Sequence, residues 1–377
     1  MFSKNIFMPY RKALTTGTFC LSAAVLSVTS TVSAEKNSGV TSKLSPSVME
    51  VLEVYATPLH SSTIESALPV NVISGDELKL KQASTLGETL KNEVGVHSSF
   101  YGSVASSPII RGLDGPRVLI TQNGLDAGDA SRVGADHAVA TETSTATQIE
   151  VLRGPATLFY GSGAIGGVVN VVDNRVPTSS DTLIDWLLQY NDVSNEKQGS
   201  FSLQTGNDNI AVHLDGFWRD AGDYKLPKGF DADALEDEHE EHEEKQPTHL
   251  TGSDSKSSGF TLGSSYLFDQ GFVGFSYGLI TRDYGIPGHS HHEEEHEEEL
   301  EEHEEGTKAE MQQDRFQLLS EANFNQGFIK QLAAKFAYTD YQHQEIEDGA
   351  VGTTFTNKSI EIKADLYHQD YLGWQGA

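Results

Sequence analysis

Two runs in which histidine is interspersed with carboxylate residues are the clearest chemistry-bearing feature of this sequence. The first spans residues 236–244, with one further histidine just beyond it, and the second spans residues 289–305. Together the runs hold 17 of the 55 acidic residues of the chain. Imidazole and carboxylate suit borderline divalent metals such as zinc, nickel or copper. The histidines that we expect to bind metal here are His239, His242, His249, His289, His291, His292, His296 and His303.

The alternative for both runs is a disordered, solvated stretch of charge. We favour metal capture because histidine recurs within both runs, and a purely acidic tract has no need of it. If the second run is helical, His292, His296 and His303 fall within roughly 40° of one another around the helix. A metal ion could order the segment in that way.

Three further candidate ligands lie in the first half of the chain. Asp136 and His137 are adjacent in a polar loop, and His97 precedes the Tyr101-Gly102 turn. Neutral imidazole is the commonest protein metal ligand, although a single loop histidine is more often solvated. The single cysteine, Cys20, lies in the N-terminal segment, so histidine and carboxylate must hold any metal.

The length and charge narrow the possible functions. The chain has 377 residues, enough for two domains, and a formal net charge of -29. Such acidity argues against nucleic acid as a partner and favours cations. No nucleophile–base arrangement stands out, so we expect no enzyme activity and no organic cofactor.

The N-terminus is typical of a secretory signal peptide over residues 1–34. Lys4, Arg11 and Lys12 precede an apolar stretch, and Val32-Ser33-Ala34 offers a small-residue cleavage site. A transmembrane anchor is the alternative for this segment, but the apolar run is too short and interrupted. A lipid anchor is the alternative for Cys20, but Thr18-Phe19 is a poor context for it. Residues 35–49 are polar, and we expect them to be flexible.

The rest of the chain is organised around residues 149–171. Residues 148–152 and 168–172 predict two strands, separated by an Arg-Gly-Pro turn and a glycine cluster. Gly161 to Gly166 spell G-x-G-x-x-G, but a dinucleotide site needs that motif to follow a strand and open a helix. A strand follows it here, so we reject a nucleotide site.

This stretch, together with Pro108 to Gly112 upstream, resembles the plug-domain signature of TonB-dependent outer-membrane receptors. The resemblance covers residues 50–177 and implies a small α+β plug. Residues 50–56 (Glu50, Val51, Leu52, Glu53, Val54, Tyr55 and Ala56) resemble a TonB box, although the first plug strand fits them equally well. The residues that carry the plug signature are Arg111, Gly112, Arg153, Gly154, Pro155, Gly161, Gly163, Gly166 and Gly167.

After Pro177 apolar and polar residues alternate, as in Ile210, Val212 and Leu214. About seven or eight such runs, separated by short turns that alternate with long polar segments, predict the N-terminal part of an antiparallel transmembrane β-barrel over residues 178–377. The long segments fall on the cell exterior. A soluble β-sandwich is the alternative. Plugged transporters have about 22 strands, so we expect the barrel to be incomplete in this chain.

The His-rich segments resemble the zinc-specific branch of these receptors. In that branch an Asp-His pair precedes the Tyr-Gly turn; here Ser99 and Phe100 stand at those places, and His97 is a possible substitute. Asp136 and His137 match another pair of that branch. The resemblance implies uptake of a divalent metal, most simply zinc, through the outer membrane of a Gram-negative bacterium.

The implied partners are outer-membrane lipid and TonB with ExbB and ExbD. A siderophore or haem receptor, a surface metal-binding module that does not transport, and a soluble acidic β protein remain alternatives.

Overall fold

The computed structural model describes residues 54–56, 69–227, 248–287, 307–347, 349–374 and 376–377. The expected signal peptide, residues 50–53 of the expected TonB box and both His-rich runs lie outside these ranges. His249 is described, whereas His239, His242, His289, His291, His292, His296 and His303 are not. Within the described part of the chain, no helix combines the length and apolar character needed to cross a membrane.

The first half of the described chain is a small α+β unit around a five-stranded sheet. Its strand order is β1-β6-β7-β4-β5, with β4 and β7 parallel and the other neighbours antiparallel. A β2–β3 hairpin, two short α-helices and two 3-10 helices complete it. The elements are β1 (Val70–Ser74), α1 (Gly75–Lys81), α2 (Leu86–Leu90), β2 (Val96–Ser98), β3 (Pro108–Ile110), η1 (Gly115–Arg117), β4 (Val118–Gln122), β5 (Leu125–Asp126), β6 (Gln148–Leu152), η2 (Gly154–Tyr160) and β7 (Gly167–Val172).

Local sequence signals account for several of these boundaries. The Thr85 side chain accepts a hydrogen bond from the Glu88 N–H and caps α2. Asn123 and Gly124 both have positive φ and close the β4–β5 hairpin. The glycine motif follows η2 and leads into β7, so a strand rather than a helix follows it, as the sequence predicts.

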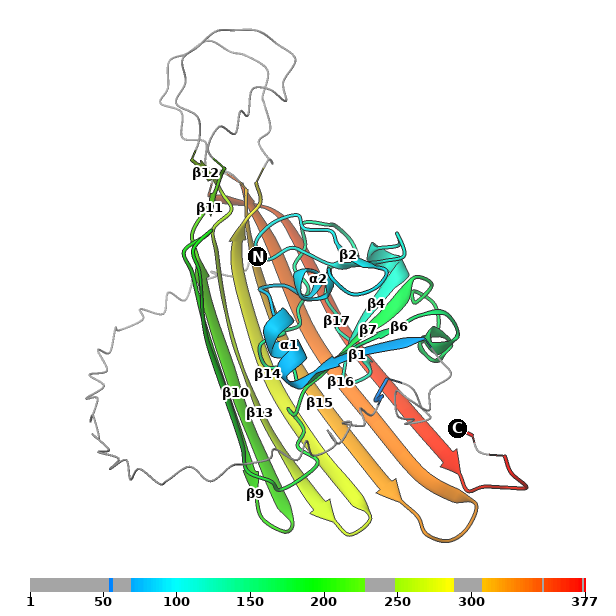
Figure 1. The fold of residues 1–377 in the computed structure, drawn as a ribbon. Helices are drawn as coiled ribbons and strands as arrows, with labels where there is room; N and C mark the ends of the chain where they lie inside the picture. The colour runs from blue at the N-terminus through cyan, green and yellow to red at the C-terminus, as the bar shows by residue number, and fades with distance from the viewer. Residues whose placement is uncertain (1–53, 57–68, 228–247, 288–306, 348, 375) are drawn as a thin grey trace, which may run out of the picture. The chain divides into compact units, whose positions relative to one another are not determined.

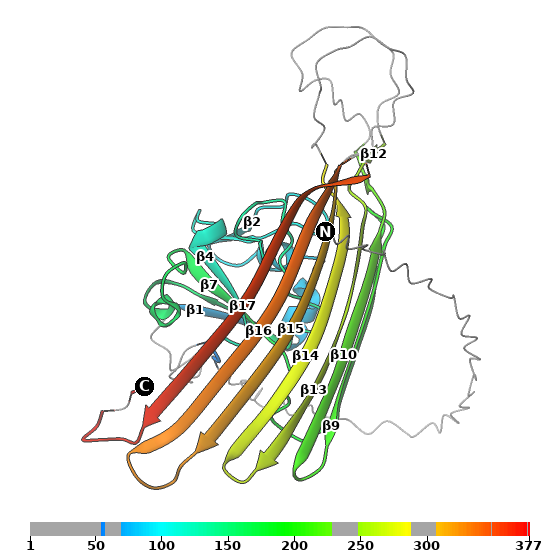
Figure 2. The same ribbon diagram turned by 180° about the vertical axis from the view of Figure 1, so that it is seen from behind.

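The second half forms one eight-stranded antiparallel sheet with the strand order β17-β16-β15-β14-β13-β10-β9-β8 (Figures 1 and 2). Neighbouring strands of this sheet therefore also follow one another along the chain. A small β11–β12 pair lies between β10 and β13 in the sequence. The elements are β8 (Leu183–Asn191), β9 (Glu196–Gly206), β10 (Ile210–Ala221), β11 (Tyr224–Lys225), β12 (His249–Leu250), β13 (Ser255–Phe268), β14 (Gly271–Gly285), β15 (Lys308–Asn323), β16 (Ile329–Glu347) and β17 (Ala350–His368).

The alternating pattern sorts the side chains onto two faces, as the sequence predicts. In β10, Val212, Leu214 and Trp218 are exposed, whereas His213 and Asp215 are buried. The polar face packs against the α+β unit, and apolar residues of the two parts, including Ala138 and Met311, share one buried cluster. An apolar outer face and a polar inner face are typical of an outer-membrane barrel wall.

The expected alternation of short and long connections is only partly correct. The two long polar segments do join β10 to β13 and β14 to β15 at one end of the sheet. At that same end, however, β8–β9 and β16–β17 are joined by short connections, residues 192–195 and 348–349. A tight connection needs only a few turn residues, so strand alternation alone cannot reveal its length.

Candidate metal centre

The loop between β5 and β6 carries Asp136 and His137. The partly buried carboxylate of Asp129 ties this loop together, because it accepts hydrogen bonds from the N–H and hydroxyl of Ser131 (3.0 and 2.6 Å) and from the Ala140 N–H (2.8 Å). Burial raises the pKa of Asp129. The loop is thus closed around His137, which is only 2% exposed rather than solvated.

The imidazole of His137 is already oriented as a metal ligand would be. Its Nδ1–H donates a 2.9 Å hydrogen bond to the Ala130 carbonyl oxygen. A ligating histidine commonly donates one ring N–H to a carbonyl, which fixes the tautomer. The lone pair of Nε2 is therefore available for a metal.

The opposite wall of the site comes from β16. His343 and Glu345 are two residues apart, so both side chains lie on the inner face of the strand. His343 has no exposed surface, and neither of its ring nitrogens has a hydrogen-bond partner among the described residues. Buried polar groups are normally paired, so these two nitrogens are candidate metal ligands.

His137, His343 and Glu345 form a three-residue cluster whose candidate ligand atoms all lie within 4.8 Å of one another. The Nε2 atom of His137 is 3.4 Å from Oε1 of Glu345, and that oxygen is 4.0 Å from Nε2 of His343. Ligand atoms of a tetrahedral zinc site lie roughly 3.4 Å apart, given Zn–N bonds of about 2.1 Å. A small contraction of the cluster would produce that geometry, and Oδ2 of Asp136, 3.8 Å from His137 Nε2, is a possible fourth ligand.

One aromatic side chain, Phe355, packs against both imidazoles of the cluster. The rings of His137 and His343 are 4.5 Å apart between centroids, and Phe355 of β17 meets the His137 ring edge-on at 4.6 Å. Phe355 is also 5.8 Å from the ring of His343. Such apolar walls strengthen the interaction between a cation and its ligands, because they keep water away.

The structure brings together some of the residues predicted from the sequence. His137 belongs to the cluster and Asp136 lies beside it, with Oδ2 3.8 Å from His137 Nε2. His97 is exposed on β2 and His249 is exposed on β12, and neither belongs to a metal-ligand group among the described residues. Sequence reasoning missed His343 and Glu345. The available signal was a His-x-Glu pair on the polar, inward side of an alternating strand.

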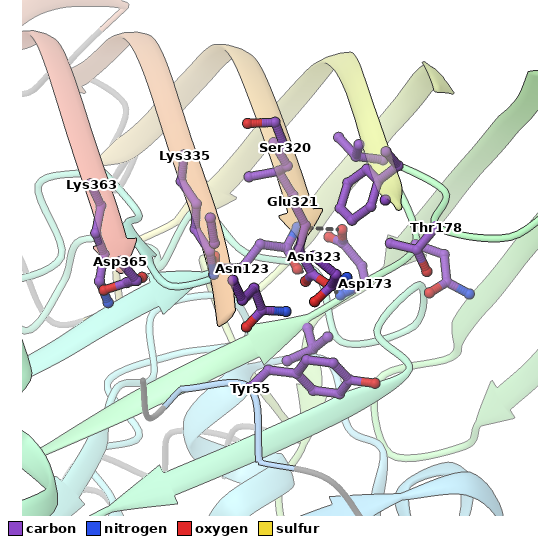
Figure 3. A pocket seen from close by; sticks show the side chains of 18 of the residues that line it. Tyr55, Asn123, Asp173, Thr178, Ser320, Glu321, Asn323, Lys335, Lys363 and Asp365 are labelled. Atoms are coloured by element: carbon purple, nitrogen blue, oxygen red, sulfur yellow. Dashed lines mark hydrogen bonds between the residues drawn. The ribbon is translucent and has the colours of Figure 1, made fainter. Parts of the chain in front are cut away.

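A second feature is a polar cavity of about 970 Å³ between the α+β unit and the sheet (Figure 3). Its lining carries both signs of charge, including Lys335, Lys363 and Asp365. Lys335 Nζ donates to the Asn123 carbonyl (3.0 Å), and Lys363 Nζ lies 4.7 Å from the centroid of the Tyr160 ring. None of the described histidines lines this cavity, so it does not compete with the cluster as a metal centre.

The described end of the expected TonB box lies beside this cavity. Tyr55 lines the cavity, and residues 54–56 belong to no strand; β1 is the first strand within the described ranges. The fully buried carboxylate of Glu150 accepts the N–H groups of Tyr55 and Ala56 (2.6 and 2.8 Å), and the Tyr160 hydroxyl donates to the Ala56 carbonyl (2.8 Å). These bonds hold the segment against the sheet.

Comparison with known proteins agrees with this architecture. Residues 62–168 match the family model of the TonB-dependent Receptor Plug Domain. A ferric enterobactin receptor mutant from Pseudomonas aeruginosa is 16% identical with a TM-score of 0.59, and the match covers 82% of this chain and 48% of that chain. The copper transporter OprC is 14% identical with a TM-score of 0.62, and the match covers 80% of this chain and 44% of that chain. The siderophore receptor PirA from Acinetobacter baumannii is 16% identical with a TM-score of 0.56, and the match covers 84% of this chain and 46% of that chain. The chain thus spans about half the length of these receptors.

The class of protein follows from the match and the fold together. The α+β unit is a TonB-dependent receptor plug, and the eight-stranded sheet is of the kind that forms the barrel of such receptors. The expected fold class is therefore confirmed, and the chain is a Gram-negative outer-membrane protein.

Proposed function

We propose that this chain belongs to a TonB-dependent receptor that takes up a divalent metal ion, most simply zinc. The observation that carries the proposal is the cluster of His137, His343 and Glu345, in which a fully buried imidazole has no hydrogen-bond partner among the described residues. In this proposal the ion is the substrate, held between the plug and the barrel wall. TonB with ExbB and ExbD supplies the work that moves the plug.

The donor set favours a bare ion over a metal chelate. All three ligand side chains are at most 17% exposed, and Phe355 covers both imidazoles. A siderophore or haem needs a wide, accessible surface, which this enclosure does not offer. The acidic His-rich segments would raise the local concentration of cations and pass them inward.

Copper is a second candidate substrate. Met311 of β15 lies directly across the strand pair from His343 and is buried on the same face. Thioether sulfur is a soft ligand that favours Cu(I). The similarity to a copper transporter concerns the fold, so the choice between the metals rests on this donor set.

The test is calorimetric titration of the detergent-extracted protein with zinc, nickel and copper. We expect His137→Ala and His343→Ala each to weaken binding of the preferred metal at least about 10-fold, because each removes one ligand. The matched control is His368→Ala. It removes a partly buried histidine that stacks on Phe328 and lies outside the cluster.

Equal affinities in all variants would remove the cluster as the site. If none of the three metals binds the native protein, a siderophore or haem becomes the leading substrate. A protein that binds metal but gives no energy-dependent uptake in cells would be a surface metal-binding module.

A further inference from the structure

Tyr284, the penultimate residue of β14, contacts the metal-binding loop on both sides of His137. Its hydroxyl donates a 2.8 Å hydrogen bond to the Asp136 carbonyl oxygen and accepts a 3.1 Å bond from the Ala138 N–H. The two peptide groups that flank His137 are therefore attached to one side-chain oxygen of the barrel wall.

We infer that Tyr284 is a positioning residue for metal binding, which sets the backbone of His137 relative to the ligands on β16. The inference rests on the proposed function, because it concerns the same site. Within the plug, the Nδ1 bond to Ala130 fixes the tautomer and tilt of the His137 ring. That bond does not fix the distance from the loop to the barrel wall, whereas the two bonds from Tyr284 do.

The ring of Tyr284 also supports the second half of the site. Its centroid lies 6.2 Å from that of His343, and both rings are buried. One side chain thus contacts both the backbone that carries His137 and the imidazole ring of His343. Groups that orient metal ligands in this way typically contribute 10–100-fold to metal affinity.

The substitution Tyr284→Phe isolates this role, because it removes the hydroxyl and keeps the ring. It leaves the Asp136 carbonyl and the Ala138 N–H without their partner. The matched control is Tyr277→Phe on the same strand, where the lost hydroxyl donates to Asp314 on the outer face. Three quantities are measured in the detergent-extracted protein: zinc affinity by titration, the visible spectrum of bound Co²⁺, and hydrogen exchange of the Ala138 amide without metal.

We expect Tyr284→Phe to weaken zinc binding by about 10- to 100-fold, to change the Co²⁺ spectrum, and to accelerate exchange at Ala138. Tyr277→Phe should match the native protein in all three. Unchanged zinc affinity and Co²⁺ spectrum in Tyr284→Phe would overturn the inference, as would equal losses in both variants.

If the native protein binds none of zinc, Co²⁺, nickel and copper, the proposed function fails and the positioning role fails with it. If the native protein and Tyr284→Phe bind zinc equally tightly, the positioning role alone is overturned and the proposed function stands.

Discussion

Glu142 of the plug and Arg219 of β10 form a buried ion pair across the boundary between plug and barrel wall. Nη2 of Arg219 donates to one carboxylate oxygen at 3.1 Å, and Nη2 of Arg282 on β14 lies 3.4 Å from the other. All three side chains are at most 4% exposed. A single plug carboxylate therefore neutralises cations on two separate strands of the sheet.

The first prediction concerns the removal of this charge. Glu142→Gln leaves two buried guanidinium groups under-neutralised, and breaking a buried pair in this way typically costs about 3–5 kcal/mol. We expect the amides of residues 141–145 to exchange about 100-fold faster or more. The control is Asp185→Asn, which breaks an exposed plug–barrel pair with Lys79 and should have little effect. Equal exchange in both variants would contradict the prediction.

The second prediction is a pH dependence of the same anchor. Burial alone would raise the pKa of Glu142, but Arg219 and Arg282 outweigh it and hold this pKa below its usual 4.5. The stability that the ionised group contributes is present above pH 4.5 and is lost as the pH falls through the folded-state pKa. The difference in plug melting temperature between native protein and Glu142→Gln should therefore be large at pH 7 and shrink below pH 4.5, as measured by scanning calorimetry. A difference that does not change with pH would disprove it.

The third prediction concerns the segment that contains Tyr55 and Ala56. Glu150→Gln keeps one acceptor oxygen and replaces the other by a donor, so one of the two N–H groups loses its partner. Hydrogen bonds to charged groups contribute about 1.5–3 kcal/mol, and we expect amide exchange at Tyr55 or Ala56 to rise about 10- to 100-fold. Glu88→Gln, whose carboxylate pairs with Lys91, is the control. The same exchange rate in native protein and Glu150→Gln would show that the carboxylate does not hold the segment.

The fourth prediction concerns Gly167, the first residue of β7. A Cβ atom at Gly167 would lie 2.6 Å from the Ile110 side chain and 2.9 Å from the Leu152 carbonyl oxygen. Gly167→Ala should therefore destabilise the plug by about 1–3 kcal/mol, the usual cost of overpacking. A Cβ at Gly102 meets its nearest neighbour at 3.9 Å, so Gly102→Ala should be neutral. Exchange of the β7 amides measures both, and equal values would refute the packing argument.

The fifth prediction separates the histidines of the two His-rich segments from the histidines of the cluster, His137 and His343. Replacing His239, His242, His292, His296 and His303 by alanine should lower the number of weakly bound zinc ions but leave the tight site at His137 and His343 intact. Titration of this variant beside His343→Ala distinguishes the two, because His343→Ala should lose the tight site and keep the weak ones. Loss of the tight site in the five-residue variant would place that site in the His-rich segments instead.

Sequence pattern was sufficient for local structure, because its causes are local. Alternation in β10 sorted Val212 and Leu214 outward and His213 inward, since successive side chains of a strand point to opposite faces. The Thr85 cap and the Asn123-Gly124 turn follow from side-chain and backbone preferences within a few residues. The plug signature likewise indicated the correct family of fold. The length of the β8–β9 and β16–β17 connections was not predictable, because both short and long connections are compatible with the same strands.

By itself, the sequence determined that the chain has an α+β plug followed by outward-apolar strands, and that Asp136 and His137 are candidate ligands. Only the tertiary structure decided which residues complete the cluster. His343 and Glu345 lie in a different domain, and their His-x-Glu spacing on an inward strand face does not show which plug residues they meet. They meet His137 because the plug packs against that face, and the position of such a contact depends on the packing of the whole interface rather than on any short segment.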